Sequence, residues 1–262
     1  MPLPHPTLED LVIALRLSNK PNIIVEGKED EIIYGRLVER LGRFGVGFFN
    51  AGSKNTLLHL YKELSQYESL GDFRHTPVAF IADRDMWLFS GIPEGYADII
   101  WTQGYSIEND LYVSAELESF LETHQHETHR QVLDAVCRWF AFEVEVFLKG
   151  DAAYVAEGLD EIVPRGKTEL DDAFLKRRGF LLPQEERYQQ IREAHGLQLR
   201  GKLLFQTLLR FLNAADRELR FQTTHHGLFA IALDRPVSSQ LFDRLIQEVE
   251  RKLSDQKQRI TQ

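Results

Sequence analysis

Two short acidic motifs contain the residues whose types and spacing could carry out chemistry. In the first, VEGKED at residues 25–30, Glu26 follows an apolar run and precedes a glycine. A carboxylate in that position lies at the mouth of a sheet, and the glycine lets a ligand approach the backbone closely. Glu26 is therefore a candidate metal ligand or general base. An ordinary exposed glutamate in a strand-to-helix loop would show the same pattern.

The second motif, FIADRD at residues 80–85, ends a strongly apolar run with two carboxylates, Asp83 and Asp85. Side chains at i and i+2 of an extended segment point to the same side, so both could face one hard cation. Magnesium takes a few carboxylates together with waters and phosphate oxygens. A pair of loop carboxylates without a ligand is the alternative, and the presence of both motifs in one chain makes it less attractive.

The surrounding sequence predicts the strands and helices that would position these carboxylates. Short β-branched or apolar runs alternate with segments of helical spacing. Strands that alternate with helices form parallel sheets, whose functional residues gather at the carboxyl ends of the strands. Residues 26, 83 and 108 can therefore converge. The expected strands are 22–25, 45–50, 77–85 and 98–102, and the expected helices include 34–41, 56–64 and one that begins at Ser106, where SIEN resembles a capping box.

From about residue 115 onward the strand signals fade and helical spacing dominates. Residues 128–148 predict a long helix, and 149–183 read as a connector with short helices. The segments 201–219 and 238–253 predict two amphipathic helices. We therefore expect an α/β fold with a mainly parallel sheet flanked by helices, over residues 1–114. A mainly helical C-terminal region is expected over residues 115–262.

Composition is that of an ordinary globular protein. The chain has 262 residues, 43% of them hydrophobic and 27% charged, which suits one or two domains. A basic leader and a membrane-length apolar run are both missing from the sequence, so a cytoplasmic location is expected. The net charge of −9 is uneven, because residues 1–164 carry 13 basic and 27 acidic residues, whereas residues 165–262 carry 18 and 13.

Three motifs, VEGKED, FIADRD and YSIENDLY at residues 105–112, together resemble the Toprim superfamily, and most closely its OLD-like branch of standalone Toprim proteins. The resemblance covers residues 20–115 and continues more weakly to RGKLLFQTLLRFL at 200–212. It implies a Toprim sheet that binds Mg²⁺ or Mn²⁺, with Glu26 as metal ligand and acid/base residue. It also implies that Asp83 and Asp85 are metal ligands and that Asp30 and Glu108 are ligands of a second metal.

The same resemblance implies an activity. Topoisomerases and primases of the superfamily have D-x-D-x-D, whereas Trp87 occupies the third acidic position here, which favours a nuclease-like arrangement. Carboxylates with a divalent metal suit phosphodiester hydrolysis. We therefore expect a metal-dependent nuclease acting on DNA or RNA, as an antiphage defence effector. The alternatives are a non-catalytic Toprim module that binds nucleic acid or protein, and a phosphohydrolase acting on nucleotides. Three costly convergent carboxylates argue against the non-catalytic module.

Expected partners are nucleic acid, a separate ABC-type ATPase and a second copy of the chain in a homodimer, without a membrane partner. The segment PRGKTELDD at 164–172 has Glu161 where a P-loop needs glycine, so this chain is not expected to bind ATP. Several basic residues could contact a phosphate backbone, although solvated helix faces would explain most of them. These are Lys28, Lys54, Lys176, Arg177, Arg178, Arg200, Lys202 and Arg210.

A histidine cluster, His124, His126 and His129, has the spacing H-x-H-x-x-H. It could hold zinc, but no cysteine or carboxylate is tied to it at ligand spacing. A surface cluster at the start of a helix is the interpretation that we favour.

Overall fold

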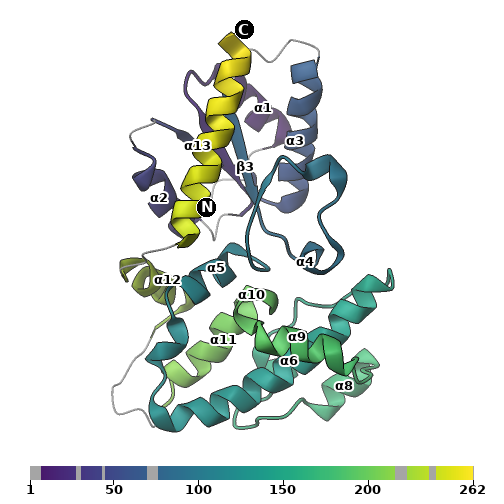
Figure 1. Ribbon diagram of the computed structural model, residues 1–262. Coiled ribbons are helices and arrows are strands. Elements are labelled where there is room, and N and C mark those ends of the chain that lie inside the picture. Colours follow the sequence, from purple (N-terminus) through teal and green to yellow (C-terminus); the bar gives the residue numbers. More distant parts are fainter. Residues whose placement is uncertain are drawn as a thin grey trace. The chain divides into compact units, whose positions relative to one another are not determined.

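A computed structural model describes residues 7–27, 31–42, 45–69, 76–215, 223–235 and 240–261 (Figure 1). The chain forms two compact units. The first, here called the sheet unit, comprises residues 1–83, 92–102 and 238–262. The second, the helical unit, comprises residues 84–91 and 103–237.

In its described part, the sheet unit contains a parallel four-stranded sheet with the order β2-β1-β3-β4. The central strands β1 and β3 are buried along their whole length, which explains why both are continuous apolar runs rather than alternating ones. In the register, Val25 of β1 lies opposite both Asn50 and Ile81. The strands are β1 (Asn22–Val25), β2 (Gly47–Asn50), β3 (Val78–Ala82) and β4 (Ile100–Trp101).

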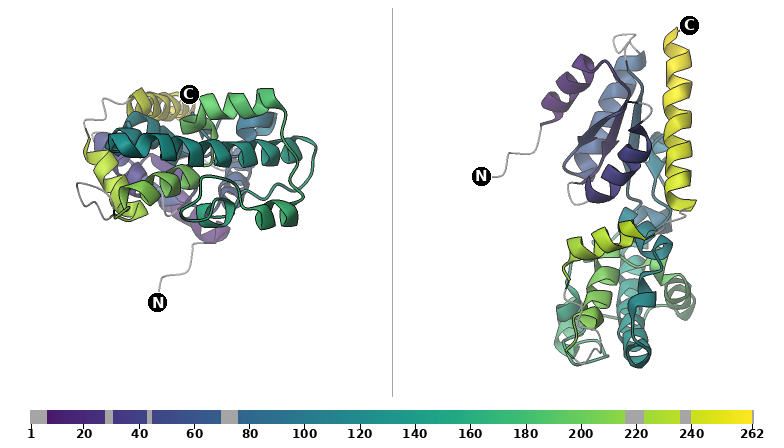
Figure 2. Two further views of the ribbon diagram at one scale, coloured as in Figure 1. Left: turned by 90° about the horizontal axis from the view of Figure 1, so that it is seen from below. Right: turned by 90° about the vertical axis from the view of Figure 1, so that its left-hand side faces the viewer.

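Helices cover this sheet. The last helix of the chain, α13, contacts β3, β4 and α2, whereas α1 contacts α3. Figure 1 and the right-hand view of Figure 2 show α13 running along the sheet. These helices contribute buried apolar side chains to the core, among them Leu57 of α3 and Leu245 of α13. The helices are α1 (Leu8–Leu17), α2 (Glu31–Arg40), α3 (Lys54–Ser69) and α13 (Gln240–Thr261), with the 3-10 turn η2 (Glu94–Tyr96).

The helical unit has its own aromatic core, which includes Trp139, Phe140, Phe205 and Phe229. Helix α6 packs against α9 and α11, and α5 packs against α10 and α11. The elements are α4 (Trp87–Ser90), α5 (Ile107–Ser114), η3 (Leu117–Phe120), η4 (Thr123–Gln125), α6 (His126–Leu148), α7 (Leu159–Ile162), α8 (Asp172–Arg178), α9 (Glu185–Glu193), α10 (His195–Gln198), α11 (Gly201–Leu212) and α12 (His225–Asp234).

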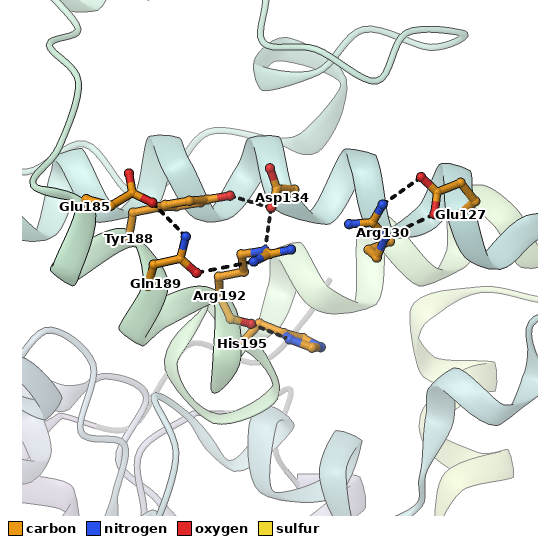
Figure 3. Close-up of polar contacts among 8 residues, drawn as sticks. All are labelled: Glu127, Arg130, Asp134, Glu185, Tyr188, Gln189, Arg192 and His195. Carbon is orange, nitrogen blue, oxygen red and sulfur yellow. Dashed lines mark hydrogen bonds and ion pairs between the residues drawn. The ribbon is translucent and has the colours of Figure 1, made fainter.

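Polar side chains join α6 to α9 (Figure 3). Asp134 of α6 accepts a hydrogen bond from the Tyr188 hydroxyl at 2.5 Å and pairs with the Arg192 guanidinium at 2.7 Å. The Arg138 guanidinium lies 4.0 Å from the centre of the Tyr188 ring. The α6–α9 contact therefore combines charge, hydrogen bonding and cation–π packing.

The expected α/β class is confirmed: a parallel sheet flanked by helices, with a helical C-terminal region. All four strands occur where they were predicted, although β3 ends at Ala82 and β4 has only two residues. Helices α1, α9 and α12 were not predicted, and α11 ends at Leu212 rather than near residue 219. In α9 the reason is its polarity, since only Tyr188 and Ile191 of its nine residues are buried.

The compact units do not follow the order of the chain, because α13 returns to the sheet and residues 84–91 leave it. The domain boundary at 114/115 stays a prediction. Among the described residues, no helix is both long and apolar enough to cross a membrane.

Candidate active site

Glu26 and Asp83 meet at the carboxyl edge of the sheet. Glu26 directly follows β1, Asp83 directly follows β3, and these strands are neighbours. The Asp83 N–H donates to Glu26 Oε2 at 3.4 Å. From β1 the chain leads to β2 on one side, and from β3 it leads to β4 on the other. The two carboxylates thus lie at the topological switch point, where open α/β sheets bind ligands.

The loop from β2 to α3 reaches the same edge. Asn50 Oδ1 accepts a hydrogen bond from the Gly52 N–H at 2.7 Å, and Gly52 takes the left-handed conformation with φ of 83°. Ser53 Oγ accepts from the Thr56 N–H at 3.2 Å, so it caps α3. Lys54 Nζ then donates to the Asp83 carbonyl oxygen at 2.7 Å. A positive charge therefore lies beside the backbone of Asp83.

Asp85 belongs to the helical unit and has an unusual backbone. Its φ is 49°, in the left-handed region, and its N–H donates to the Tyr105 carbonyl oxygen at 2.7 Å. The assumption that Asp83 and Asp85 share one extended segment is therefore wrong, because the strand ends at Ala82 and the chain turns at Asp85. Its role as a metal ligand stays a prediction.

Glu108 is the second residue of α5 and is buried in the helical unit. Its Oε1 lies 3.8 Å from His225 Nε2. A Cβ atom placed on Gly201, the first residue of α11, would lie 2.5 Å from Glu108 Oε2 and 2.5 Å from Ser106 Oγ. Glu108 is thus packed closely against the start of α11, and only a glycine at 201 leaves room for it.

Two neighbours of Glu108 tie the same segment together. Ser106 and Asn109 form the capping box that the SIEN sequence predicted. The Asn109 amide also donates to the carbonyl oxygens of Gly196 and Leu199, at 2.8 and 2.7 Å. Asp110 accepts the N–H groups of residues 103 and 104, at 2.9 and 2.6 Å. Sequence reasoning missed these roles of Asn109 and Asp110, and also His225, because their partners are set by tertiary packing.

The donor chemistry at the sheet edge fits Mg²⁺ or Mn²⁺. Two carboxylates can supply the protein share of a magnesium shell, which otherwise keeps waters and takes phosphate oxygens. Among the described residues, no three His, Cys, Asp or Glu side chains are grouped closely enough to hold a metal ion. Asp30, a predicted ligand, and Lys28, a predicted nucleic-acid contact, lie outside the described residues.

Three of the basic residues predicted to bind nucleic acid have charged or carbonyl partners within the helical unit. Arg178 forms a two-bond ion pair with Glu143, with both N–O distances 2.7 Å. Arg200 donates to the Val155 carbonyl at 2.6 Å, and Arg210 pairs with an Asp160 oxygen at 2.8 Å. Their role towards nucleic acid stays a prediction. Lys176 and Arg177 are exposed on α8, and Lys202 is the second residue of α11.

The histidine cluster is at a helix start as predicted, because α6 begins at His126. The expectation that all three side chains lie on the surface is wrong for His129, which is only 3% exposed and packs edge-to-face on Phe211. Burial lowers the pKa of His129 to about 4, so the ring is neutral at pH 7.

Comparisons with known proteins add no relative. No protein-family model matches the chain, and no curated protein is similar to it.

Proposed function

We propose that this chain is a divalent-metal-dependent nuclease of the Toprim type, which hydrolyses phosphodiester bonds of DNA or RNA. The observation that carries this proposal is that Glu26 and Asp83 follow the two neighbouring strands at the switch point of a 2-1-3-4 parallel sheet, where the Asp83 N–H donates to Glu26 Oε2. Carboxylates from two neighbouring strands at one sheet edge are the ligand type that a divalent cation such as Mg²⁺ takes. Their place at the ligand-binding edge favours a cation.

In this proposal Glu26 and Asp83 hold Mg²⁺ or Mn²⁺, and Asp85, Asp30 and Glu108 are further predicted ligands. When bound, the metal neutralises phosphate charge and lowers the pKa of a bound water. Glu26 is the proposed acid/base residue and accepts the proton of the attacking water. Lys54, whose ammonium group already lies at the Asp83 carbonyl, holds that segment and attracts the phosphate to the edge.

The broader proposal follows from the sequence resemblance: a cytoplasmic antiphage defence effector that acts with a separate ABC-type ATPase and works as a homodimer. The helical unit would support the substrate or the partner. These parts of the proposal do not depend on the sheet-edge geometry, and each can fail without the nuclease assignment failing.

The decisive experiment compares wild type with Glu26→Gln and Asp83→Asn on single- and double-stranded DNA and RNA, with Mg²⁺, Mn²⁺ or EDTA. Glu94→Gln is the matched control, because Glu94 is an exposed glutamate of the same unit. We expect metal-dependent cleavage that falls about 100-fold or more in both site variants and is unchanged in the control.

Other outcomes would contradict the proposal in different ways. Cleavage that survives EDTA or Glu26→Gln excludes this site as its source. Binding of nucleic acid by wild type without any cleavage would favour the non-catalytic module. Release of phosphate from free nucleotides, without cleavage of polymers, would favour the phosphohydrolase.

A further inference from the structure

A cavity of about 360 Å³ lies in the helical unit between α5, η3 and α10. Its volume is at the small end of ligand sites, which span about 300–1,000 Å³. Its apolar lining residues, here called the floor, include Tyr112, Val113, Leu117 and Leu197. Glu26, Asp83 and Glu108 are not among the lining residues, so a role of this cavity is independent of the proposed nuclease activity.

An ion pair lies within the lining. Glu118 Oε1 accepts hydrogen bonds from the Tyr112 hydroxyl at 2.9 Å and from His195 Nε2 at 2.7 Å. The other ring nitrogen, Nδ1, lies 3.0 Å from the Arg192 carbonyl oxygen (Figure 3). Both ring nitrogens face acceptors, so both carry a proton and the imidazole is cationic. The charges of Glu118 and His195 therefore cancel within the cavity wall.

The titration of this pair agrees with its geometry. Burial acts to raise the pKa of Glu118, but the hydrogen bond and charge of His195, together with weaker effects of His129 and Tyr112, outweigh burial and bring the pKa to about 2. Burial acts to lower the pKa of His195, but the hydrogen bond and charge of Glu118 and the hydrogen bond to the Arg192 carbonyl together raise it above its ordinary value. Both groups are thus held in their charged forms.

Two further carboxylates give the cavity a net negative charge. Glu116 and Glu193 line it and are exposed, and none of the lining residues is a lysine or arginine. Both hydrogen bonds to the Glu118 carboxylate go to Oε1, and no described residue donates to its other oxygen, Oε2. The cavity therefore combines an apolar floor with two exposed carboxylates, Glu116 and Glu193, here called the rim.

The rim is held in place by a residue outside the lining. Glu116 has φ of 49°, a left-handed conformation that costs a non-glycine residue free energy. Arg235 Nη1 donates to the Ala115 carbonyl at 2.7 Å and to Ser119 Oγ at 3.0 Å, and its guanidinium lies 4.1 Å from the Phe120 ring centre. These contacts fix the turn that presents Glu116, so the rim is preorganised for a ligand.

We propose that this cavity is a docking site for a partner protein, which inserts an arginine or lysine side chain flanked by aliphatic side chains. The charged head would lie near the carboxylates of Glu116 and Glu193, and the aliphatic stem would cover the floor. A protein is favoured over a free polyamine because the floor includes exposed apolar surface, Val113 being 47% exposed, which aliphatic side chains beside the arginine or lysine would cover. A polyamine has no aliphatic side chain to cover it.

The test uses the full chain and two short peptides, an acetylated Leu-Arg-Leu amide and the same peptide with citrulline in place of arginine. Citrulline has the shape of arginine without its charge. Binding is followed by NMR on ¹⁵N-labelled protein. We expect the arginine peptide to shift the amide signals of Val113, Gly196 and Leu197 saturably, and the citrulline peptide to leave them in place.

Variants then test the rim. Glu116→Gln and Glu193→Gln should each weaken binding about threefold, as expected for partly exposed ion pairs. Glu186→Gln, an exposed glutamate on α9 outside the cavity, should leave binding unchanged. Equal binding of both peptides, shifts that map elsewhere, no binding of either peptide, or binding of spermidine in place of the arginine peptide would each overturn the proposal.

Discussion

Asp85 combines a predicted ligand role with a left-handed backbone, and the two can be separated by substitution. Asp85→Gly and Asp85→Ala both remove the carboxylate, but only glycine adopts φ of 49° without steric cost. We expect Asp85→Gly to be more stable than Asp85→Ala by about 1 kcal/mol, measured by urea unfolding. Equal stabilities would mean that the turn is not left-handed in solution. Loss of cleavage in both variants would support the ligand role.

Arg178 is predicted to be far more important for stability than its neighbour Lys176. Glu143, its partner, is 0% exposed, so removal of the guanidinium leaves a buried charge uncompensated. Arg178→Met should cost about 3–5 kcal/mol of unfolding free energy. Lys176→Met, on the exposed side of the same helix, should change it by less than about 0.5 kcal/mol.

The double variant Arg178→Met with Glu143→Leu provides the control for Arg178. It removes both charges and should recover much of the lost stability. If it is no more stable than Arg178→Met alone, the destabilisation does not come from the unpaired carboxylate.

Because His129 is buried, we expect the folded protein to lose stability in mild acid. Its folded pKa of about 4 lies below its ordinary value of 6.5, so the folded state favours the neutral ring. The resulting stabilisation is complete above pH 6.5 and is lost as the pH falls towards 4. By pH 4.5 wild type should lose on the order of 1–3 kcal/mol from this group.

The comparison that isolates this effect is His129→Phe, which keeps an aromatic ring against Phe211. Urea unfolding of both proteins is measured from pH 7 to pH 4.5. Groups that do not interact with His129 titrate equally in the two proteins, so the free-energy difference between them should move in favour of the variant as the pH falls. A difference that is constant with pH would refute the assignment.

At the scale of elements, the approach of α11 to α5 depends on a single glycine. A Cβ at Gly201 would lie 2.5 Å from Glu108 Oε2, whereas a Cβ at Gly35 in α2 meets no atom within 4 Å. Alanine favours helix over glycine at both positions. Gly35→Ala should therefore stabilise the protein by up to about 1 kcal/mol. Gly201→Ala should destabilise it by about 1–3 kcal/mol, because α11 must move away from Glu108.

Thermal and urea unfolding of the two glycine variants measure whether each substitution raises or lowers the free energy of unfolding. A stabilised Gly201→Ala would show that the start of α11 is not packed against Glu108. If Glu108 also has the proposed ligand role, Gly201→Ala should reduce cleavage at temperatures where the protein is still folded.

At the scale of the whole molecule, the sheet unit is completed by the last helix of the chain. Gln256 of α13 accepts a hydrogen bond from the Val78 N–H at 2.6 Å and donates to the Val78 carbonyl at 3.0 Å. Leu245, Val249 and Leu253 bury their side chains from the same helix. We expect removal of residues 240–262 to unfold the sheet, seen as loss of amide-exchange protection in β1 and β3.

A point variant tests the same contact without a deletion. Gln256→Ala should cost about 1–3 kcal/mol, because it leaves the buried N–H and carbonyl of Val78 unpaired. Asp255→Ala, at the exposed neighbouring position, should cost much less. Persistence of full protection in β3 after the deletion would contradict the role given to α13.

The sequence by itself determined the alternation of strands and helices and the positions of Glu26 and Asp83 after β1 and β3. It also determined the capping box at Ser106. These features depend on local periodicity and on side chains a few residues apart, which a sequence displays directly. The sequence determines the strand order only in part. The tertiary structure decided that β1 and β3 are neighbours, and therefore that Glu26 and Asp83 lie together at the switch point.

Only the tertiary structure decided which residues pair over long separations. Arg178 and Glu143 are 35 residues apart, and Gln256 and Val78 are 178 apart, so no local pattern marks them. The left-handed turn at Asp85 and the burial of His129 could not be predicted from the sequence either. Each follows from what packs against the residue rather than from its neighbours in the chain. Packing selects one partner for each charged group among many that the sequence allows.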